Sequence, residues 1–305
     1  MAPLLGGGTM KTDPRIAFLI AAHDRPAHLH RLLGALAHPS TGVFLHIDAK
    51  SDLASPNLAA FPNMTLCSPA ISVHWGGISQ VQATLALMEQ AVSDPGFSHF
   101  VFISGSDYPL RPIGEIVEFF ADNPDTVFMN AERMPVWHKP LPWIEYHHPQ
   151  PTDPPLQRAW RRFARRALKP LARRDYAAAL KGRVPYGGTC WWALPRSAVE
   201  FLLETIDQEP DLLEFFRNTH CPDETLLPTL MMNGPFAGAR RNTLTWADWS
   251  KGGAHPATIA AEHIPALLRA GEKREYLFAR KFPDDSAALL SALEQRWRKG
   301  AQPMQ

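Results

Sequence analysis

Cysteine is scarce in this sequence of 305 residues, which holds only Cys67, Cys190 and Cys221. An odd number argues against a disulfide framework, and their spacing matches no pattern of cysteine metal ligands. The formal net charge is only +1, so the composition as a whole does not indicate a nucleic-acid partner. We therefore expect a reducing, cytoplasmic setting and no nucleic-acid partner.

Long apolar runs are also missing, since none approaches the roughly 20 residues that a membrane-spanning helix requires. The N-terminal segment lacks a charged region followed by an apolar stretch of signal-peptide length. We expect residues 1–14 to be a flexible leader, with Met10 as an alternative start. One domain over residues 15–290 and a tail over residues 291–305 should follow.

Proline and tryptophan, by contrast, are abundant, with 29 and 9 residues. Prolines follow many apolar runs and cluster over residues 135–155, which indicates irregular loops rather than a helical bundle. Tryptophan side chains often line sugar-binding sites, although burial in a core is the commoner reason for their presence. Both interpretations of the tryptophans stay open at this point.

Apolar, strand-length runs alternate with segments of helical periodicity along most of the chain. The predicted strands are 15–24, 42–50, 99–107, 126–132 and 189–195, and the predicted helices are 25–38, 78–94, 113–124, 196–206, 223–233 and 259–271. This alternation predicts an α/β fold with a mainly parallel central sheet flanked by helices. Ligands of such sheets bind beyond the carboxyl ends of the strands. Residues 22–24, 48–50 and 104–108 should therefore meet at one edge.

Residues 156–183 form the most basic segment, with ten lysines and arginines against the single acid Asp175. Trp160 and Phe163 belong to a pattern of roughly helical spacing, which Pro170 interrupts. A basic amphipathic helix of this kind can lie on an anionic membrane surface. A solvated basic face, or a flap over a bound donor, is the alternative. A helical insertion is expected in either case.

Two acidic positions stand out. Asp107 follows a predicted strand, where it can bind a ligand or simply form the turn before Pro109. Asp223 and Glu224 follow Pro222 in the first turn of a predicted helix. A ligand-site carboxylate is one interpretation there, and a favourable interaction with the positive helix end is the other.

Adjacent cations, Arg280 and Lys281, stand between two phenylalanines near the C-terminus. Two cations held beside a packed segment suit a phosphate group, and ion pairs with the two aspartates that follow are the alternative. Trp75 is followed by two glycines before a predicted helix, which allows close approach of the backbone to a ligand. The loop histidines show no metal-ligand spacing, so no metal is predicted.

Seven stretches, taken together and in order, resemble one family. They are IAFLIAAHDRPAHLHRLLGAL, VFLHIDAKSD, VHWGGISQVQATLALM, HFVFISGSDYPL, GTCWWALPRSAVEFL, CPDETLLPTLMMN and YLFARKF. Over residues 15–282 the chain is similar to the core-2/I-branching β-1,6-N-acetylglucosaminyltransferases and their relatives, the peptide O-xylosyltransferases. The resemblance implies a GT-A-like fold and an inverting transferase that uses a UDP-sugar, with no metal or other cofactor.

The same resemblance implies roles for individual residues. Glu224 would be the catalytic base, and Arg280 and Lys281 would bind the UDP diphosphate. Nucleotide-sugar transferases commonly carry an Asp-x-Asp metal site after this strand, but here only Asp107 remains. The implied donor contacts are Ala22, His23, Asp48, Trp75 and Gly76, and the implied substrate contacts are Asp107, Tyr108, Trp191, Trp192 and Trp246.

One position departs from the family pattern. Many relatives carry an arginine where Thr245 stands, so one contact is missing or comes from Arg240 or Arg241. The expected activity is transfer of a sugar, first of all N-acetylglucosamine, to a hydroxyl of a glycan or lipid-linked glycan in bacterial surface polysaccharide synthesis. This places the protein in the cytoplasm, with peripheral contact to an anionic membrane. UDP-xylose or another UDP-hexose as donor, an inactive sugar-binding protein, and a metal-dependent transferase using Asp107 are the alternatives.

Overall fold

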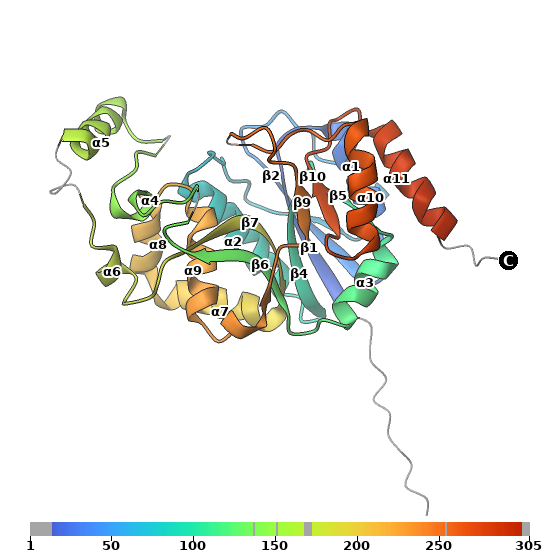
Figure 1. Cartoon of the computed structure of the whole chain (residues 1–305), viewed down its shortest axis with the longest axis horizontal. Coiled ribbons are helices and arrows are strands. Elements are labelled where there is room, and N and C mark those ends of the chain that lie inside the picture. The colour runs from blue at the N-terminus through green and yellow to red at the C-terminus, as the bar shows by residue number, and fades with distance from the viewer. Residues whose placement is uncertain (1–13, 137, 151, 168–172, 254, 301–305) are drawn as a thin grey trace, which may run out of the picture.

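The computed structural model describes residues 14–136, 138–150, 152–167, 173–253 and 255–300 (Figure 1). The predicted leader over residues 1–14 lies outside the described residues except for its last position. Residues 301–305, at the end of the predicted tail, also lie outside them.

A seven-stranded sheet runs through the described chain in the order β3-β2-β1-β4-β7-β6-β8. Its strands are β1 (Arg15–Ala22), β2 (Thr41–Ile47), β3 (Met64–Leu66), β4 (Phe97–Ser104), β6 (Val127–Arg133), β7 (Tyr186–Pro195) and β8 (Arg240–Arg241). The pairs β1–β2, β1–β4, β2–β3 and β6–β8 are parallel, whereas β7 is antiparallel to both of its neighbours. The prediction of an α/β, GT-A-like domain with a mainly parallel central sheet is confirmed.

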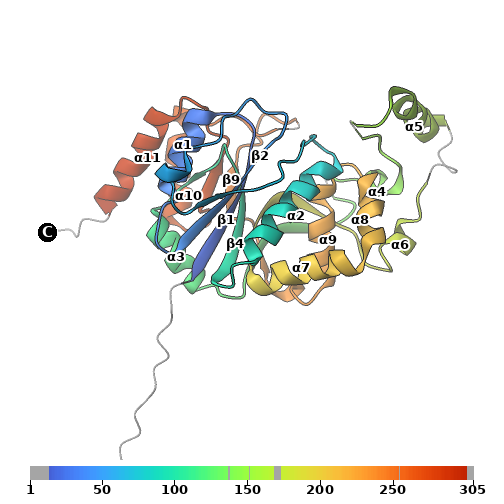
Figure 2. The same ribbon diagram turned by 180° about the vertical axis from the view of Figure 1, so that it is seen from behind.

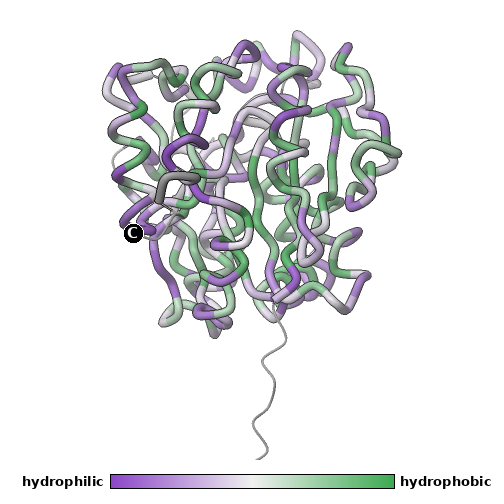
Figure 3. Tube along the Cα trace, turned by 90° about the vertical axis from the view of Figure 1, so that its right-hand side faces the viewer, coloured by the Kyte–Doolittle hydropathy of each residue, from purple (hydrophilic) through white to green (hydrophobic). Residues whose placement is uncertain are grey.

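The composition of β1 explains why the strands are continuous apolar runs in the sequence. Ile16, Phe18 and Ile20 belong to a core cluster on one face of the sheet, and Ala17 and Leu19 belong to the cluster on the other. A strand covered on both faces has no polar side, so alternation disappears. Figure 3 shows the apolar residues gathered along the central strands.

Helices cover both faces of the sheet, as Figures 1 and 2 show from opposite sides. The first core cluster takes residues from α1 (Pro26–Ala35), α3 (Ile113–Ala121), α10 (Ile264–Glu272) and α11 (Ala287–Gly300). The second takes residues from α2 (Ile78–Val92), α7 (Arg196–Gln208), α8 (Pro210–Arg217) and α9 (Leu226–Asn233). The apolar stripe of each helix thus faces the sheet, as its periodicity in the sequence requires.

A second, smaller sheet joins the C-terminal part of the chain to the end of β4. Its order is β5-β10-β9, with bounds Tyr108–Pro109, Phe278–Arg280 and Thr245–Ala247. β10 is antiparallel to β5 and parallel to β9. Short 3-10 helices lie at η1 (Leu58–Ala60), η2 (Pro222–Glu224), η3 (Ala237–Ala239) and η4 (Ala261–His263). The small sheet carries the two C-terminal cations to the loop after β4.

The predicted division at residue 290 falls inside helix α11. Leu290 and Leu293 of this helix are buried in the first core cluster, and Trp297 packs against it. These residues recur every three or four positions, which is the spacing of one helix face. The described part of the predicted tail is therefore a helix packed on the domain.

The predicted helical insertion over residues 156–183 contains two helices, α5 (Pro155–Ala167) and α6 (Tyr176–Ala179), and α4 (Pro142–Glu145) precedes them. Residues 168–172, with the predicted break at Pro170, lie outside the described chain. Among the described residues, no helix combines the length and the apolar character that a bilayer crossing requires.

Candidate functional site

The carboxyl ends of β1, β2 and β4 meet at one edge of the large sheet, as predicted. The backbone N–H of Asp48 donates to the carbonyl of Ala22 at 2.9 Å, and Gly105 donates to Ala21 at 2.9 Å. Gly105 has no room for a side chain, because a Cβ there would lie 2.8 Å from the Cβ of Ala22. The glycine of the loop after β4 therefore allows two strand ends to approach each other closely.

Asp48 faces its own loop at this edge. Its carboxylate accepts hydrogen bonds from the backbone N–H groups of Lys50 (2.9 Å) and Val73 (3.1 Å) and an ion pair from Lys50 Nζ (2.8 Å). Burial acts to raise the pKa of Asp48, but these hydrogen bonds outweigh it and lower the pKa below its ordinary value. The neighbouring His23 is exposed, with Nε2 3.8 Å from the carboxylate of Asp24.

Asp107 is fully buried and forms an ion pair with Arg280, whose Nε lies 3.1 Å from its Oδ1. The carboxylate also accepts hydrogen bonds from the hydroxyl and the backbone N–H of Ser104, at 2.5 and 3.2 Å. Burial raises the pKa of Asp107, and Arg280 and Ser104 act in the opposite direction. The oxygens of Asp107 are thus occupied and hold Arg280, and its predicted role as a substrate contact stays a prediction.

The other side of Arg280 lies on an aromatic ring. Its guanidinium carbon is 3.8 Å from the ring centroid of Trp191, which stacks in turn on Phe102 at 5.5 Å and 16°. A guanidinium between a carboxylate and an indole has little freedom to rotate. Lys281 follows it, half-buried, and its pKa is lowered by burial and by the charge of Arg280. One fixed and one freer cation therefore stand side by side.

Glu224 lies at the end of a strained turn. The turn begins at Cys221, whose φ of 45° is left-handed. The carboxylate of Glu224 is 28% exposed and pairs with Lys139, whose Nζ lies 3.2 Å from Oε2. The adjacent Asp223 points inward and accepts a hydrogen bond from Gln80 at 3.2 Å. Burial and the charge of Glu224 raise the pKa of Asp223 to about 7. Of the two acids, Glu224 is the one that a substrate can reach.

The Trp75–Gly76 segment connects this turn to the basic pair. The backbone N–H of Cys221 donates to the carbonyl of Gly76 at 3.1 Å, and Gly76 has a φ of 70° that favours glycine. Trp75 is 57% exposed, with ring centroids of His220 and His255 at 6.1 and 5.8 Å. Burial, and then the charges of Lys281 and Arg280, lower the pKa of His255. Trp75 therefore lies between the acid turn and the two cations.

Cys190 shows that the acid turn and the basic pair belong to one site. Burial raises the pKa of its thiol well above the ordinary value, and the charges of Asp223 and Glu224 add to this effect. The charge of Arg280 lowers the same pKa. The geometry agrees, because β7, which carries Cys190, contacts the turn that ends at Glu224, and the ring of the next residue, Trp191, lies under Arg280.

Three predicted site residues lie elsewhere. Trp192 is 3% exposed and stacks on Phe102 in the second core cluster. Trp191 stacks on the same Phe102 ring beside a bulge of β7, but its ring also contacts Arg280. Trp246 packs against the first core cluster, with the ring of His263 at 6.0 Å. Trp192 and Trp246 thus have packing contacts here, and their predicted substrate contacts stay predictions.

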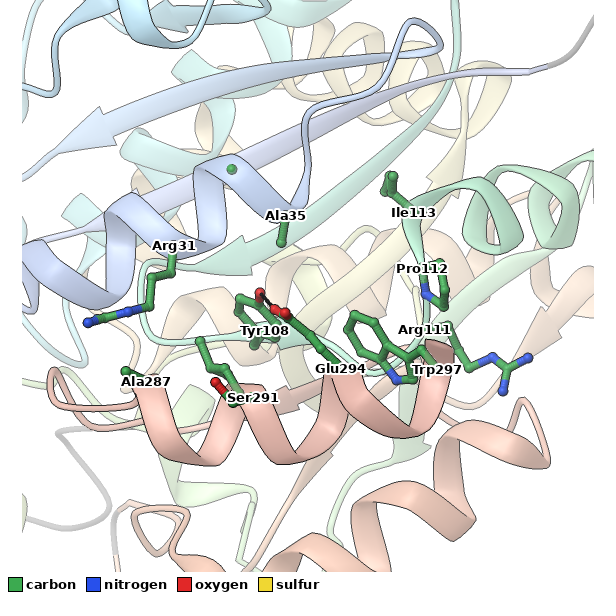
Figure 4. Close-up of a pocket in the computed structure, with 12 residues that line it drawn as sticks. Arg31, Ala35, Tyr108, Arg111, Pro112, Ile113, Ala287, Ser291, Glu294 and Trp297 are labelled. Atoms are coloured by element: carbon green, nitrogen blue, oxygen red, sulfur yellow. Dashed lines mark hydrogen bonds between the residues drawn. The ribbon is translucent and has the colours of Figure 1, made fainter. Parts of the chain in front are cut away.

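Tyr108 is the third predicted site residue that lies away from the acid turn and the basic pair. Its ring is 2% exposed, and its hydroxyl donates to Glu294 of α11 at 2.7 Å. Figure 4 shows Tyr108 and Glu294 with Trp297 in a separate groove of about 660 Å³ between α1 and α11. Tyr108 and the preceding Asp107 therefore face different surroundings, although they are neighbours in the sequence.

Many relatives have an arginine at the position of Thr245, and Arg240 and Arg241 were the candidates to take its place. The structure puts these two arginines on another sheet than Thr245. Thr245 is buried on β9, opposite Phe278 in the register. Both arginines lie on β8, the last strand of the large sheet, and their described hydrogen bonds are to Asn242 and to a backbone carbonyl of β8. Within the described chain, no group of three or more histidine, cysteine, aspartate or glutamate side chains gathers as a metal site would require.

Sequence reasoning missed three residues of this site. Lys139 pairs with Glu224 from a loop outside every predicted element, and His255 lies beside Trp75 in the segment between β9 and β10. Neither position carries a local signal. Cys190 does carry one, because it precedes Trp191 in a predicted strand, which in the structure begins at the site edge.

This arrangement is an α/β domain with a reachable carboxylate and two cations beyond the strand ends. A sequence profile described as "Branch: Core-2/I-Branching enzyme" matches residues 16–269, and the chain belongs to this family.

Curated relatives are xylosyltransferases by name. Xylosyltransferase oxt of Drosophila melanogaster is 28% identical over 315 residues, covering 94% of this chain and 34% of that protein. Xylosyltransferase 2 of Rattus norvegicus is 26% identical over 250 residues, covering 78% and 27%. The chain thus spans about a third or less of the length of these relatives. Among solved structures, apo mouse xyloside xylosyltransferase 1 superposes with a TM-score of 0.36 at 12% identity, covering 85% of this chain and 94% of that one.

Proposed function

We propose that this domain transfers a sugar from a UDP-sugar to an acceptor hydroxyl, with inversion at the anomeric carbon and without a metal ion. The observation that carries the proposal is that β7 contacts both the turn that ends at Glu224 and, through the ring of Trp191, the guanidinium of Arg280, which Lys281 follows. A binding module needs cations for the diphosphate, but it does not need a reachable carboxylate opposite them. The inactive sugar-binding alternative therefore finds less support.

In the proposed reaction, the acceptor oxygen attacks the anomeric carbon of the donor from the face opposite UDP. The Glu224 carboxylate takes the hydroxyl proton as the new C–O bond forms, which typically contributes about 10²–10⁴ in rate. The bond between the anomeric carbon and the phosphate oxygen breaks, and its electron pair leaves with UDP. Lys139 holds the carboxylate of Glu224 in place through the 3.2 Å ion pair.

Arg280 and Lys281 stabilise the negative charge that develops on the leaving diphosphate. Fixed cations in a site that excludes water are effective because they need no rearrangement during the reaction. The metal-free proposal is supported by the place of Arg280, whose guanidinium lies against Asp107, the one acid left where an Asp-x-Asp site would stand. A guanidinium there supplies positive charge where related enzymes use a divalent cation.

The proposed donor is UDP-N-acetylglucosamine, and the names of the curated relatives make UDP-xylose the second candidate. The proposed acceptor is a hydroxyl of a glycan or lipid-linked glycan, within bacterial surface polysaccharide synthesis. The donor pocket decides between the two sugars, and it is shaped in part by Trp75 and His255 at the exposed side of the site.

The proposal is tested by measuring UDP release from UDP-N-acetylglucosamine, UDP-xylose, UDP-glucose and UDP-galactose, each with EDTA and with Mn²⁺. Release from at least one donor that EDTA leaves unchanged is the expected result. Activity that EDTA abolishes and Mn²⁺ restores would overturn the metal-free mechanism. Tight UDP binding without release from any donor, in the presence of mixed glycan acceptors, would favour a binding protein.

A further inference from the structure

Helix α5 separates basic from apolar residues around its axis. At about 100° per residue, Leu156, Trp160 and Phe163 fall within roughly 60° of one another. Arg158 and Arg162 fall on the opposite half of the helix by the same count. A helix with aromatic and aliphatic residues on one side and arginines on the other has the composition of interfacial membrane helices.

The apolar face of α5 is open to solvent. Leu156 is 87% exposed, Trp160 is 59% exposed and Phe163 is 54% exposed. The rings of Trp160 and Phe163 lie 5.8 Å apart, so they form one continuous patch. Three of the six large hydrophobic residues that are exposed in the described chain lie on this one helix. A patch of this kind marks an interaction surface.

Polar contacts fix the base of the insertion while the helix stands away from the domain. Arg161 donates to Asp153 and to Asn218, both at 2.7 Å, and thus ties α5 to the end of α8. Arg174, just before α6, lies 3.6 Å from the ring centroid of Phe215 and donates to the carbonyl of Asn218. Figures 1 and 2 show α5 beyond the body of the molecule, at the end toward which β1 runs. The helix and the carboxyl edge of the sheet therefore face the same side.

We propose that α5 binds the surface of an anionic lipid bilayer, with Leu156, Trp160 and Phe163 inserted between headgroups and the arginines on the phosphates. Charge complementarity selects this occupant. Arg161, Arg173, Lys181 and Arg183 are paired with acids outside the segment, but Arg158 and Arg162 on the polar side of α5 are in none of the ion pairs of the described chain. Anionic headgroups attract such segments, and the attraction is screened by salt.

Membrane binding by α5 adds an acceptor class to the proposed function. It would turn the carboxyl edge of the sheet toward the membrane, where a lipid-linked acceptor lies. The binding itself does not rest on that function. It is measured without donor or acceptor, so its failure and the failure of sugar transfer are separate results.

The test is flotation of the full chain with vesicles of phosphatidylcholine alone and of phosphatidylcholine mixed with phosphatidylglycerol. Binding to the anionic vesicles only, lost at high salt, is the expected result. The double variant Trp160→Ser/Phe163→Ser and the double variant Arg158→Gln/Arg162→Gln should each lower the bound fraction at least about tenfold. UDP release with a soluble acceptor should stay unchanged, because α5 holds no residue of the proposed site.

Matched control variants distinguish binding through α5 from nonspecific vesicle binding by other exposed residues. Leu58→Ser/Trp249→Ser removes two exposed apolar residues elsewhere, and Arg240→Gln/Arg241→Gln removes two cations elsewhere. Both should bind vesicles like the unchanged chain. No binding to anionic vesicles, equal binding to neutral vesicles, or equal losses in the controls would each overturn the proposal. Binding of single-stranded RNA in preference to vesicles would also overturn it.

Discussion

The guanidinium of Arg280 occupies the side of Asp107 that faces the candidate site, with Nε 3.1 Å from Oδ1. Both side chains are nearly inaccessible to solvent, at 9% and 0% exposure. The acid at the end of β4 therefore acts on the site through the arginine that it holds. This relationship determines how the two residues should respond to substitution.

Asp107→Asn should lower the free energy of unfolding by about 3–5 kcal/mol, because it leaves a buried guanidinium without its counter-charge. Urea unfolding at neutral pH measures this loss. Glu272→Gln is the matched control, since it removes the carboxylate of an exposed pair with Arg296 at 3.3 Å. That change should cost at most about 1 kcal/mol. Equal costs for the two variants would contradict the structural role of Asp107.

Lys281→Met should lower the rate of UDP release by about 10²–10³, with little change in stability, because the amine is the freer of the two cations. Lys251→Met, on an exposed loop, is the control and should leave the rate unchanged. Steady-state kinetics with the best donor from the screen provide the comparison. A rate within threefold of the unchanged chain, roughly, would contradict the proposed diphosphate contact.

The affinity for UDP should also depend on alkaline pH. Burial and Arg280 lower the pKa of Lys281, so its amine loses its charge at a lower pH than an ordinary lysine. UDP affinity should therefore fall as the pH rises through this range. Lys281→Arg should remove the decline, because a guanidinium stays charged throughout. Titration calorimetry from neutral to alkaline pH measures both proteins. If UDP affinity still falls with rising pH in Lys281→Arg, a group other than Lys281 is responsible for the pH dependence.

Glu224→Gln should keep UDP binding and lose about 10²–10⁴ of the transfer rate, since the amide cannot accept the hydroxyl proton. Calorimetric UDP binding and donor turnover are measured on the same preparation. Glu214→Gln is the control, because Glu214 is exposed and pairs only with Arg217 among the described ion pairs. Near-unchanged transfer by Glu224→Gln would show that another group is the base.

Acidic pH should lower the stability that the buried, neutral His28 contributes next to Asp107. His28 is fully buried, with Nδ1 2.8 Å from the hydroxyl of Ser286 and Nε2 3.0 Å from the backbone carbonyl of Asp107. Burial lowers its pKa to about 4. Because the unfolded chain protonates this histidine near pH 6.5, the unfolded state binds more protons between pH 6.5 and 4. The stability from neutral His28 is complete above this window and is lost as the pH falls through it.

The expected loss is roughly 3 kcal/mol, at about 1.4 kcal/mol for each unit of difference in pKa. Urea unfolding of the unchanged chain and of His28→Gln across this pH range isolates the contribution, since every other titrating group is common to both. The variant should be less stable at neutral pH and should show the shallower pH dependence. Identical slopes would show that His28 does not titrate as the structure implies.

The order of strands and helices was predictable because burial on both faces produces continuous apolar runs, and β1 is the clearest case. The meeting of residues 22–24, 48–50 and 104–108 followed from parallel pairing, and the structure confirms it. The reversal of β7 could not be predicted, since an antiparallel strand covered on both faces has the same composition as a parallel one.

Side-chain direction marks the limit of the site predictions. Trp191 and Trp192 are adjacent and both stack on Phe102, but Arg280 lies over the ring of Trp191, and the sequence does not say which ring carries it. Tyr108 and Asp107 diverge because β5 begins between them and turns the tyrosine toward α11. An ion pair between distant segments, such as that of Lys139 with Glu224, is not indicated by the local sequence around either residue. Leu290, Leu293 and Trp297 form one face of a helix that crosses residue 290, where only a tail was expected to begin.

The pairing of Asp107 with Arg280 also has a consequence for the order of synthesis. The two residues are 173 positions apart, so on the ribosome the acid is made long before its counter-charge. Until then the loop after β4 would bury an unpaired carboxylate, which is costly. The N-terminal strands can therefore collapse early, but the nascent chain cannot pair Asp107 at the carboxyl edge of the sheet until the small sheet has emerged. Folding of this edge should therefore be a late event.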